Sequence, residues 1–264
     1  MSGISNTPAG NEDLLTFGEH LDILRKMLFR IILVVILLAS VIFYFKDETF
    51  AILLAPRDSG FFTFSLIERR LTACGIDTHF ERYNIQLIST ELSAQFMTHI
   101  TVSCLLGALF ASPYILFELL RFVSPALYEN ERRYSLPVAL VIFSLFTLGV
   151  LMSYFILFPV SFRFLATYQV SKDIINTITL DSYISTFITL TFMVGIVFQL
   201  PLVAYTLGRM GILNAKMLKQ YRAHALVIIM IIAALITPPD IFTLVLVTLP
   251  IYGLYELSIV VVNK

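Results

Sequence analysis

Charge is what this sequence lacks most. Lysine, arginine, aspartate and glutamate make up only 14% of the 264 residues, whereas 58% are hydrophobic and the mean hydropathy is +0.87. A soluble domain usually carries about 25% charged residues. The composition therefore excludes an ordinary soluble domain and predicts a polytopic membrane protein. The formal net charge is zero, so the overall balance points to no particular class of partner.

The sequence also lacks the motifs of catalytic and metal sites. Its two cysteines are Cys74 in a predicted outside loop and Cys104 within a predicted span, and their different depths argue against a disulfide or a shared metal. Neither His-Glu-x-x-His nor Gly-x-Ser-Gly occurs. We expect no enzyme activity, no cofactor and no metal. No internal repeat is evident, which gives little support to an inverted-repeat transporter.

Long apolar segments are abundant. A helix needs roughly 20 apolar residues to cross a hydrocarbon core about 30 Å thick, because its backbone groups must be satisfied internally. Six segments meet or approach that length, at residues 27–45, 96–121, 136–158, 183–207, 223–236 and 241–262. We expect an all-α fold with six transmembrane helices, in a single transmembrane domain over residues 1–264.

The lysines and arginines predict the orientation of these spans. The larger share of the 18 falls on the side of the N-terminus, and the others are spread over longer loops. Both termini are therefore predicted to be cytoplasmic. Residues 1–26 form a cytoplasmic amphipathic segment, and the first span is expected to stay uncleaved. The predicted outside loops are 46–95 and 159–182, and the predicted cytoplasmic loops are 122–135 and 208–222.

Prolines interrupt the last spans. Pro238 and Pro239 cannot continue a helix, so residues 237–240 predict a tight turn between two short helices. Asp240 is placed to cap the sixth helix. The fifth segment offers only about 21 Å of helix, and such a mismatch is relieved by thinning the bilayer or by oligomerisation.

A few polar residues lie inside predicted spans, where they are costly. Gln199, two residues before Pro201, either contacts a docking helix or bonds a neighbouring helix of the same chain. Glu256 and Glu118 lie near the cytoplasmic ends of their spans, where a carboxylate can reach water or an arginine. His99 lies near the outside end of the second span and is interpreted as an interfacial residue.

Two acidic elements are predicted on the cytoplasmic surface. Glu129 and Glu131 lie in the loop after the second span, and Glu19 and Asp22 share a face of the N-terminal helix. The loop acids could simply pair with the following arginines. Together, however, the two elements could hold a ligand with two guanidinium groups, since arginine binds carboxylates bidentately.

Several motifs, in this order along nearly the whole chain, resemble the TatC family, the multispanning receptor of the twin-arginine protein translocase. They are Phe17-Gly-Glu-His-Leu-Asp-Ile-Leu-Arg-Lys26, Ala55-Pro56, Phe122-Val-Ser-Pro-Ala-Leu-Tyr-Glu-Asn-Glu-Arg-Arg133, Gly195-Ile-Val-Phe-Gln-Leu-Pro201, Thr237-Pro-Pro-Asp240 and Pro250-Ile-Tyr-Gly-Leu-Tyr-Glu256. Each piece alone is weak, but the set is highly specific.

The resemblance implies a receptor for the Arg-Arg signal peptides of folded proteins. It implies TatA- and TatB-type single-span partners in a multimeric complex, the proton-motive force as energy source, the bilayer of the bacterial cytoplasmic (inner) membrane as location, and no nucleic acid. Glu131 matches the family's loop glutamate that contacts the signal peptide. The other matches are loop-shaping Phe122, Pro125 and Tyr128, the N-terminal His20, Leu21, Leu24 and Arg25, and Pro56 in the first outside loop.

The chain departs from the family pattern at two positions. Ile23 stands where the family commonly has glutamate, and Glu19 and Asp22 could share that function. Gln199 replaces an intramembrane glutamate, which keeps a hydrogen-bonding group but loses the charge. The alternative function is a small-solute or ion transporter that uses Gln199, Glu256 and His99, and solute movement by the purified protein in liposomes would favour it.

Overall fold

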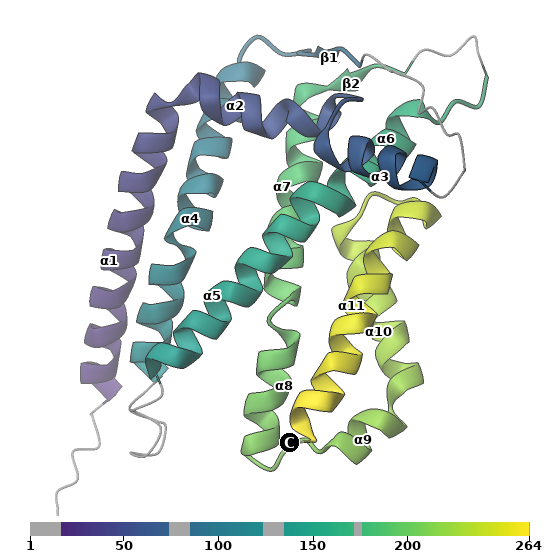
Figure 1. The fold of residues 1–264 in the computed structure, drawn as a ribbon. Coiled ribbons are helices and arrows are strands. Elements are labelled where there is room, and N and C mark those ends of the chain that lie inside the picture. The colour runs from purple at the N-terminus through teal and green to yellow at the C-terminus, as the bar shows by residue number, and fades with distance from the viewer. Residues whose placement is uncertain (1–16, 74–84, 124–134, 172–175, 264) are drawn as a thin grey trace, which may run out of the picture.

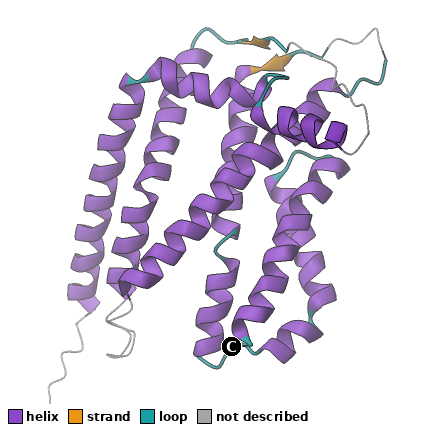
Figure 2. Ribbon diagram, in the orientation of Figure 1, coloured by secondary structure: helices purple, strands orange, loops and turns teal. Residues whose placement is uncertain are grey.

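The computed structural model describes residues 17–73, 85–123, 135–171 and 176–263. Helices dominate the described chain, and long helical runs extend from one end of the molecule to the other (Figures 1 and 2). The long helices are α1 (Phe17–Tyr44), α4 (Ala94–Val123), α5 (Ser135–Met152), α7 (Leu180–Val197) with α8 (Leu200–Arg209), α10 (Arg222–Ile236) and α11 (Ile241–Val262). All six predicted spans are helical, and the all-α membrane fold is confirmed.

Length and apolar composition qualify five of these six runs as membrane spans. The other run, α10, is shorter, as predicted. A further run that qualifies by length and composition, residues 46–73, lies in the predicted first outside loop. It consists of α2 (Lys46–Leu54), the 3-10 turn η1 (Ala55–Arg57) and α3 (Phe62–Ala73), and α2 runs across the upper end of the long helices in Figure 1.

The first connection is an ordered cap over its described part. Leu53 of α2, Pro56 of η1 and Phe64 of α3 are buried. The hydroxyl of Tyr183 on α7 donates to the Leu53 carbonyl over 2.9 Å. The short strands β1 (Leu87–Ile88) and β2 (Ile178–Thr179) pair in parallel and join the two predicted outside loops. These contacts fix the cap on α7.

The third span is longer than its hydrophobic pattern predicted. After α5 the helix widens into a π-helical turn, η4 (Ser153–Leu157), and continues as α6 (Phe158–Thr167). A π-helical turn inserts an extra residue and re-aims the side chains that follow. The helix therefore reaches Thr167, well into the stretch predicted to be the second outside loop.

An aromatic cluster forms the core where α6 meets α7. The ring of Phe158 lies edge-on to Tyr183 at 5.1 Å and to Phe187 at 4.9 Å, and Phe162 lies edge-on to Tyr183 at 4.9 Å. All four rings are buried. Each such pair contributes about 0.5–1.5 kcal/mol beyond the area that it buries, so this cluster is a rigid anchor.

Glycines permit two close helix crossings. A Cβ atom on Gly107 of α4 would lie 2.8 Å from the backbone nitrogen of Ala39 on α1. A Cβ atom on Gly149 of α5 would lie 2.8 Å from Cγ of Phe198 and 3.0 Å from Cα of Gly195. Small residues at membrane crossings let helix backbones approach closely and gain van der Waals contact. The first crossing holds α1, which packs chiefly on α4.

Candidate functional site

The two predicted acidic elements belong to neighbouring helices. α1 begins and α4 ends at the same end of the molecule, and the two helices lie side by side (Figure 1). Four predicted loop residues lie outside the described residues: Pro125, Tyr128, Glu129 and Glu131. Glu19 and His20 are in α1 and Phe122 is in α4, but their side chains are likewise not described. The topology thus brings both elements to one end, and their contacts stay a prediction.

The first turns of α1 present an open surface. Asp22 is paired with Lys26 over 2.9 Å, one helical turn later. Leu21, Leu24 and Arg25 are exposed, and the first fully buried side chain of the described part of α1 is Met27. The apolar residues of this segment therefore face lipid or a partner instead of the body of the chain. Asp22 is accessible, and its ion pair is exposed enough for the carboxylate to exchange Lys26 for a cation of a ligand.

A buried carboxylate joins α1 to α4 just inside this surface. Glu118 of α4 is only 4% exposed and accepts a hydrogen bond from Arg30 of α1 over 3.0 Å. Its second oxygen accepts one from the Tyr114 hydroxyl, also over 3.0 Å. The interpretation of Glu118 as a carboxylate that reaches an arginine is confirmed. Because Glu118 lies one turn before Phe122, this network sets how the two predicted elements are placed relative to each other.

Gln199 lies at the break between α7 and α8. Its amide nitrogen donates to the carbonyl of Ile142 on α5 over 3.0 Å. Its amide oxygen is buried and has no hydrogen-bond partner among the described residues. Pro201 is buried in the first turn of α8, where its missing N–H costs nothing. The bond to a neighbouring helix of the same chain is observed, and contact with a partner helix remains a prediction.

Glu256 of α11 is bonded to the start of α10, directly after the short helix α9 (Ala215–Gln220). Its carboxylate accepts from Arg222 of α10 over 2.7 Å and from the Tyr252 hydroxyl over 3.1 Å. The intervening connection contains Pro238 and Pro239 between the end of α10 at Ile236 and the start of α11 at Ile241. Asp240 accepts from the backbone N–H of Thr243 over 2.6 Å, which is the predicted cap.

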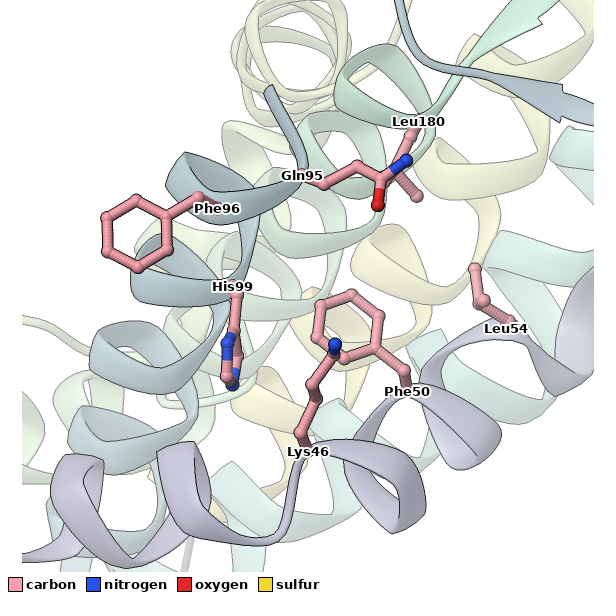
Figure 3. Close-up of a pocket in the computed structure, with 7 residues that line it drawn as sticks. All are labelled: Lys46, Phe50, Leu54, Gln95, Phe96, His99 and Leu180. Atoms are coloured by element: carbon pink, nitrogen blue, oxygen red, sulfur yellow. The ribbon is translucent and has the colours of Figure 1, made fainter. Parts of the chain in front are cut away.

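His99 belongs to a different end of the molecule. It lines a cavity of about 350 Å³ between α2, α4 and the start of α7, together with Lys46, Phe50, Leu54, Gln95, Phe96 and Leu180 (Figure 3). Its ring stacks on Phe43 at 4.0 Å and lies edge-on to Phe50 at 5.8 Å. His99 thus lies in α4, Gln199 at the break between α7 and α8, and Glu256 in α11. Each has its own surroundings, which gives no support to a shared solute pathway.

Comparison with known proteins identifies a family over nearly the whole chain. The sequence model of the family described as "Sec-independent protein translocase protein (TatC)" matches residues 19–250. A protein of that name from Blattabacterium sp. subsp. Periplaneta americana is 32% identical, covering 93% of this chain and 94% of the relative. Its namesake from Escherichia coli K12 is 30% identical, over 94% of this chain and 88% of the relative.

Solved structures agree with this similarity. A crystal structure described as that of the twin arginine translocase receptor TatC superposes with a TM-score of 0.71 at 32% identity, covering 92% of this chain and 98% of the other. A second, of the receptor in the detergent DDM, gives 0.73 at 31% identity, covering 93% and 100%. The likeness therefore extends over nearly the whole chain.

Proposed function

The chain belongs to the TatC family of Sec-independent protein translocase proteins, and from this premise we propose that it binds the Arg-Arg signal peptides of folded proteins at its cytoplasmic face. Its relatives are named as translocase proteins, which is a transport role and not catalysis. The chain is a multi-pass membrane protein. We place it in the bacterial inner membrane, with both termini and the open end of α1 in the cytoplasm.

The observation that supports this proposal best is the junction of α1 and α4. The carboxylates of Glu131 and Glu129 follow the end of α4, and those of Glu19 and Asp22 belong to the first turns of α1. The network of Arg30, Tyr114 and Glu118 holds the two helices in one register. Two arginines of a signal peptide could then each meet a carboxylate, and the planar guanidinium forks favour arginine over lysine there.

A site-specific crosslink map in cells tests the proposal. A photoreactive amino acid in place of Asn130, which keeps the neighbouring Glu131 carboxylate, should capture a precursor with an Arg-Arg signal and capture much less of one with Lys-Lys. The matched control is the same amino acid at position 91, an exposed glutamate before α4 at the opposite end, which should capture neither. Equal capture of the two precursors at position 130 would contradict the proposal.

The proposed partners are single-span proteins of the TatA and TatB type, in a multimeric complex that draws on the proton-motive force. One feature favours membrane-embedded helical partners. α1 exposes apolar side chains around most of its circumference, and a partner helix could pack against that surface within the membrane.

The short α10 supports a role in cargo passage. Its 15 residues span about 22 Å, less than the hydrocarbon core of about 30 Å. We propose that the bilayer thins around it, which lowers the barrier to a folded cargo once the partners assemble. Lengthening α10 by one helical turn should impair transport and leave signal binding intact. Normal transport by that variant would contradict this part of the proposal.

A further inference from the structure

The connection between α8 and α10 carries positive charge and no negative charge. No aspartate or glutamate occurs between Asp181 and Asp240, whereas four cationic residues fall within this connection and its two flanks. They are Arg209, Lys216, Lys219 and Arg222, all exposed. We call these four residues the α9 basic surface. It lies at the same end of the molecule as the start of α1 (Figure 1), yet has the opposite charge from the predicted signal site.

The backbone under this surface is firmly held. Gly211 ends α8 with a φ of 74°, a conformation that favours glycine. Asn214 caps α9 by accepting from the N–H of Met217 over 2.7 Å. The hydroxyl of Tyr255 on α11 donates to the carbonyl of Leu218 over 2.7 Å. The connection is therefore a fixed platform.

Packing decides which way the lysines face. Ala215 is buried and Leu218 is partly buried, so this side of α9 rests on the body of the protein. Lys216 and Lys219 are three residues apart and lie on one helix face. Both are exposed. The two ammonium groups consequently extend from the same side of a fixed short helix.

Most of this charge is not neutralised within the described chain. Arg222 pairs with Glu256 over 2.7 Å. Arg209 donates through Nε to the Tyr205 hydroxyl over 3.0 Å and lies over the Tyr205 ring at 5.5 Å, but no ion pair to it is found in the described chain. No ion pair involves Lys216 or Lys219 in the part of the chain that the structure describes. Three cations are thus available to an external anion.

Exposed apolar side chains alternate with these cations along the sequence. The exposed fractions are 67% for Met210, 59% for Ile212, 43% for Met217 and 46% for Tyr221. Such residues are unfavourable in a loop surrounded by water, but they suit the boundary between headgroups and acyl chains. The shortness of α10, which begins at Arg222, keeps this connection close to the hydrocarbon core. A connection at this distance from the core would lie at headgroup depth.

We propose that the α9 basic surface binds the phosphate headgroups of anionic phospholipids. Lys216, Lys219 and Arg209 contact the headgroup, and Met210 and Ile212 insert among the acyl chains. An acidic protein segment would satisfy the charges but would leave these apolar side chains in water, so lipid is the better fit. The proposal does not depend on signal-peptide binding. It adds a lipid site to the receptor.

Native mass spectrometry of the full chain tests this proposal. Released from detergent with phosphatidylglycerol or phosphatidylcholine, the protein should retain the anionic lipid preferentially. Lys216→Gln/Lys219→Gln should weaken retention of phosphatidylglycerol about 25-fold, because each lysine near an anionic surface contributes about fivefold. Lys216→Arg/Lys219→Arg should preserve retention. The control Arg69→Gln/Arg70→Gln removes two exposed charges from α3, at the other end, and should change retention less than twofold.

The outcomes separate lipid from other anions. Equal retention of the two lipids, or undiminished retention by the lysine-to-glutamine variant with an unchanged melting temperature, would overturn the proposal. So would displacement of phosphatidylglycerol by millimolar inorganic phosphate, which would indicate a free phosphate site, or by an oligoglutamate peptide, which would indicate a protein ligand.

Discussion

The α1–α4 pair and the aromatic core around α6 and α7 are held together in different ways. The core combines four edge-on aromatic rings with the hydroxyl of Tyr183 bonded to the cap. The pair relies on one close glycine crossing, the stacking of Phe43 on His99 and one ion-pair network around the buried Glu118 carboxylate. α1 has few other contacts within the chain. α1 therefore packs on one main neighbour, whereas α7 packs on several elements, and this leaves most of the α1 surface free to meet a ligand or partners.

The strongest expected difference between the two regions comes from the Arg30–Glu118 pair. Arg30→Gln leaves the buried Glu118 carboxylate without its cation, which should cost about 3 kcal/mol in the association of α1 with α4. Hydrogen exchange across α1 should then accelerate, while exchange in α7 stays unchanged. The double variant Arg30→Gln/Glu118→Gln removes both charges and should recover most of the loss. Equal acceleration in α1 and α7 would mean that the pair and the core are one cooperative unit.

Identical glycine substitutions should sharpen the comparison. Gly107→Ala and Gly149→Ala each place a Cβ atom within 3.0 Å of a neighbouring helix, an overlap that costs roughly 2 kcal/mol. Gly149→Ala should lower the global melting temperature, whereas Gly107→Ala should mainly loosen α1 and expose it to limited proteolysis. Gly253→Ala is the matched control, since nothing lies within 4 Å of its added Cβ. A larger fall in melting temperature for Gly107→Ala than for Gly149→Ala would contradict the prediction that the α5–α7 crossing matters more for global stability than the α1–α4 crossing.

A smaller effect is expected from the polar contact inside the core. The hydroxyls of Ser153 in η4 and Thr191 in α7 lie 3.1 Å apart and are buried. Thr191→Val removes one partner and should destabilise the protein by about 1–2 kcal/mol, because the other hydroxyl is left unsatisfied. Ser153→Ala/Thr191→Val should be nearly as stable as the original chain. The melting temperatures of the original chain, Ser153→Ala, Thr191→Val and the double variant form a double-mutant cycle, and strictly additive losses would show that the hydroxyls do not interact.

The smallest effect should come from Arg222→Gln. Its pair with Glu256 is about half-exposed, and exposed ion pairs contribute about 0–1 kcal/mol. The melting temperature should barely change, in contrast to the result for Arg30→Gln. A loss at Arg222 as large as that at Arg30 would show that burial does not account for the difference between the two ion pairs.

Much of the helical framework follows from local sequence. The six spans are visible as apolar runs, which depend only on neighbouring residues. The break beside Pro201 does not follow from its missing N–H alone, because Pro113 and Pro250 lie inside helices that continue past them. The π-helical turn at Ser153 and the β1–β2 pairing could not be predicted, since each is stabilised by contacts with distant parts of the chain. The crossing at Gly107 depends likewise on how α1 lies against α4.

The candidate site was predictable in part. Glu118 was expected to reach water or an arginine, but its partner Arg30 lies 88 positions away, and only the packing of α1 on α4 identifies it. For Gln199, two interpretations were open, and the helix packing supplies the bond to Ile142. The roles of Glu129 and Glu131 rest on the charge pattern of the two acidic elements and, for Glu131, on the family resemblance, and both residues lie outside the described residues.

The most direct test is equilibrium binding of a signal peptide to the full chain in lipid nanodiscs. An Arg-Arg peptide should bind at least tenfold more tightly than its Lys-Lys counterpart, because lysine cannot form the bidentate contact. Glu131→Gln should reduce this ratio to within twofold, and the control Glu91→Gln should leave it unchanged. Equal affinities for the two peptides, or an undiminished preference in Glu131→Gln, would contradict the central claim.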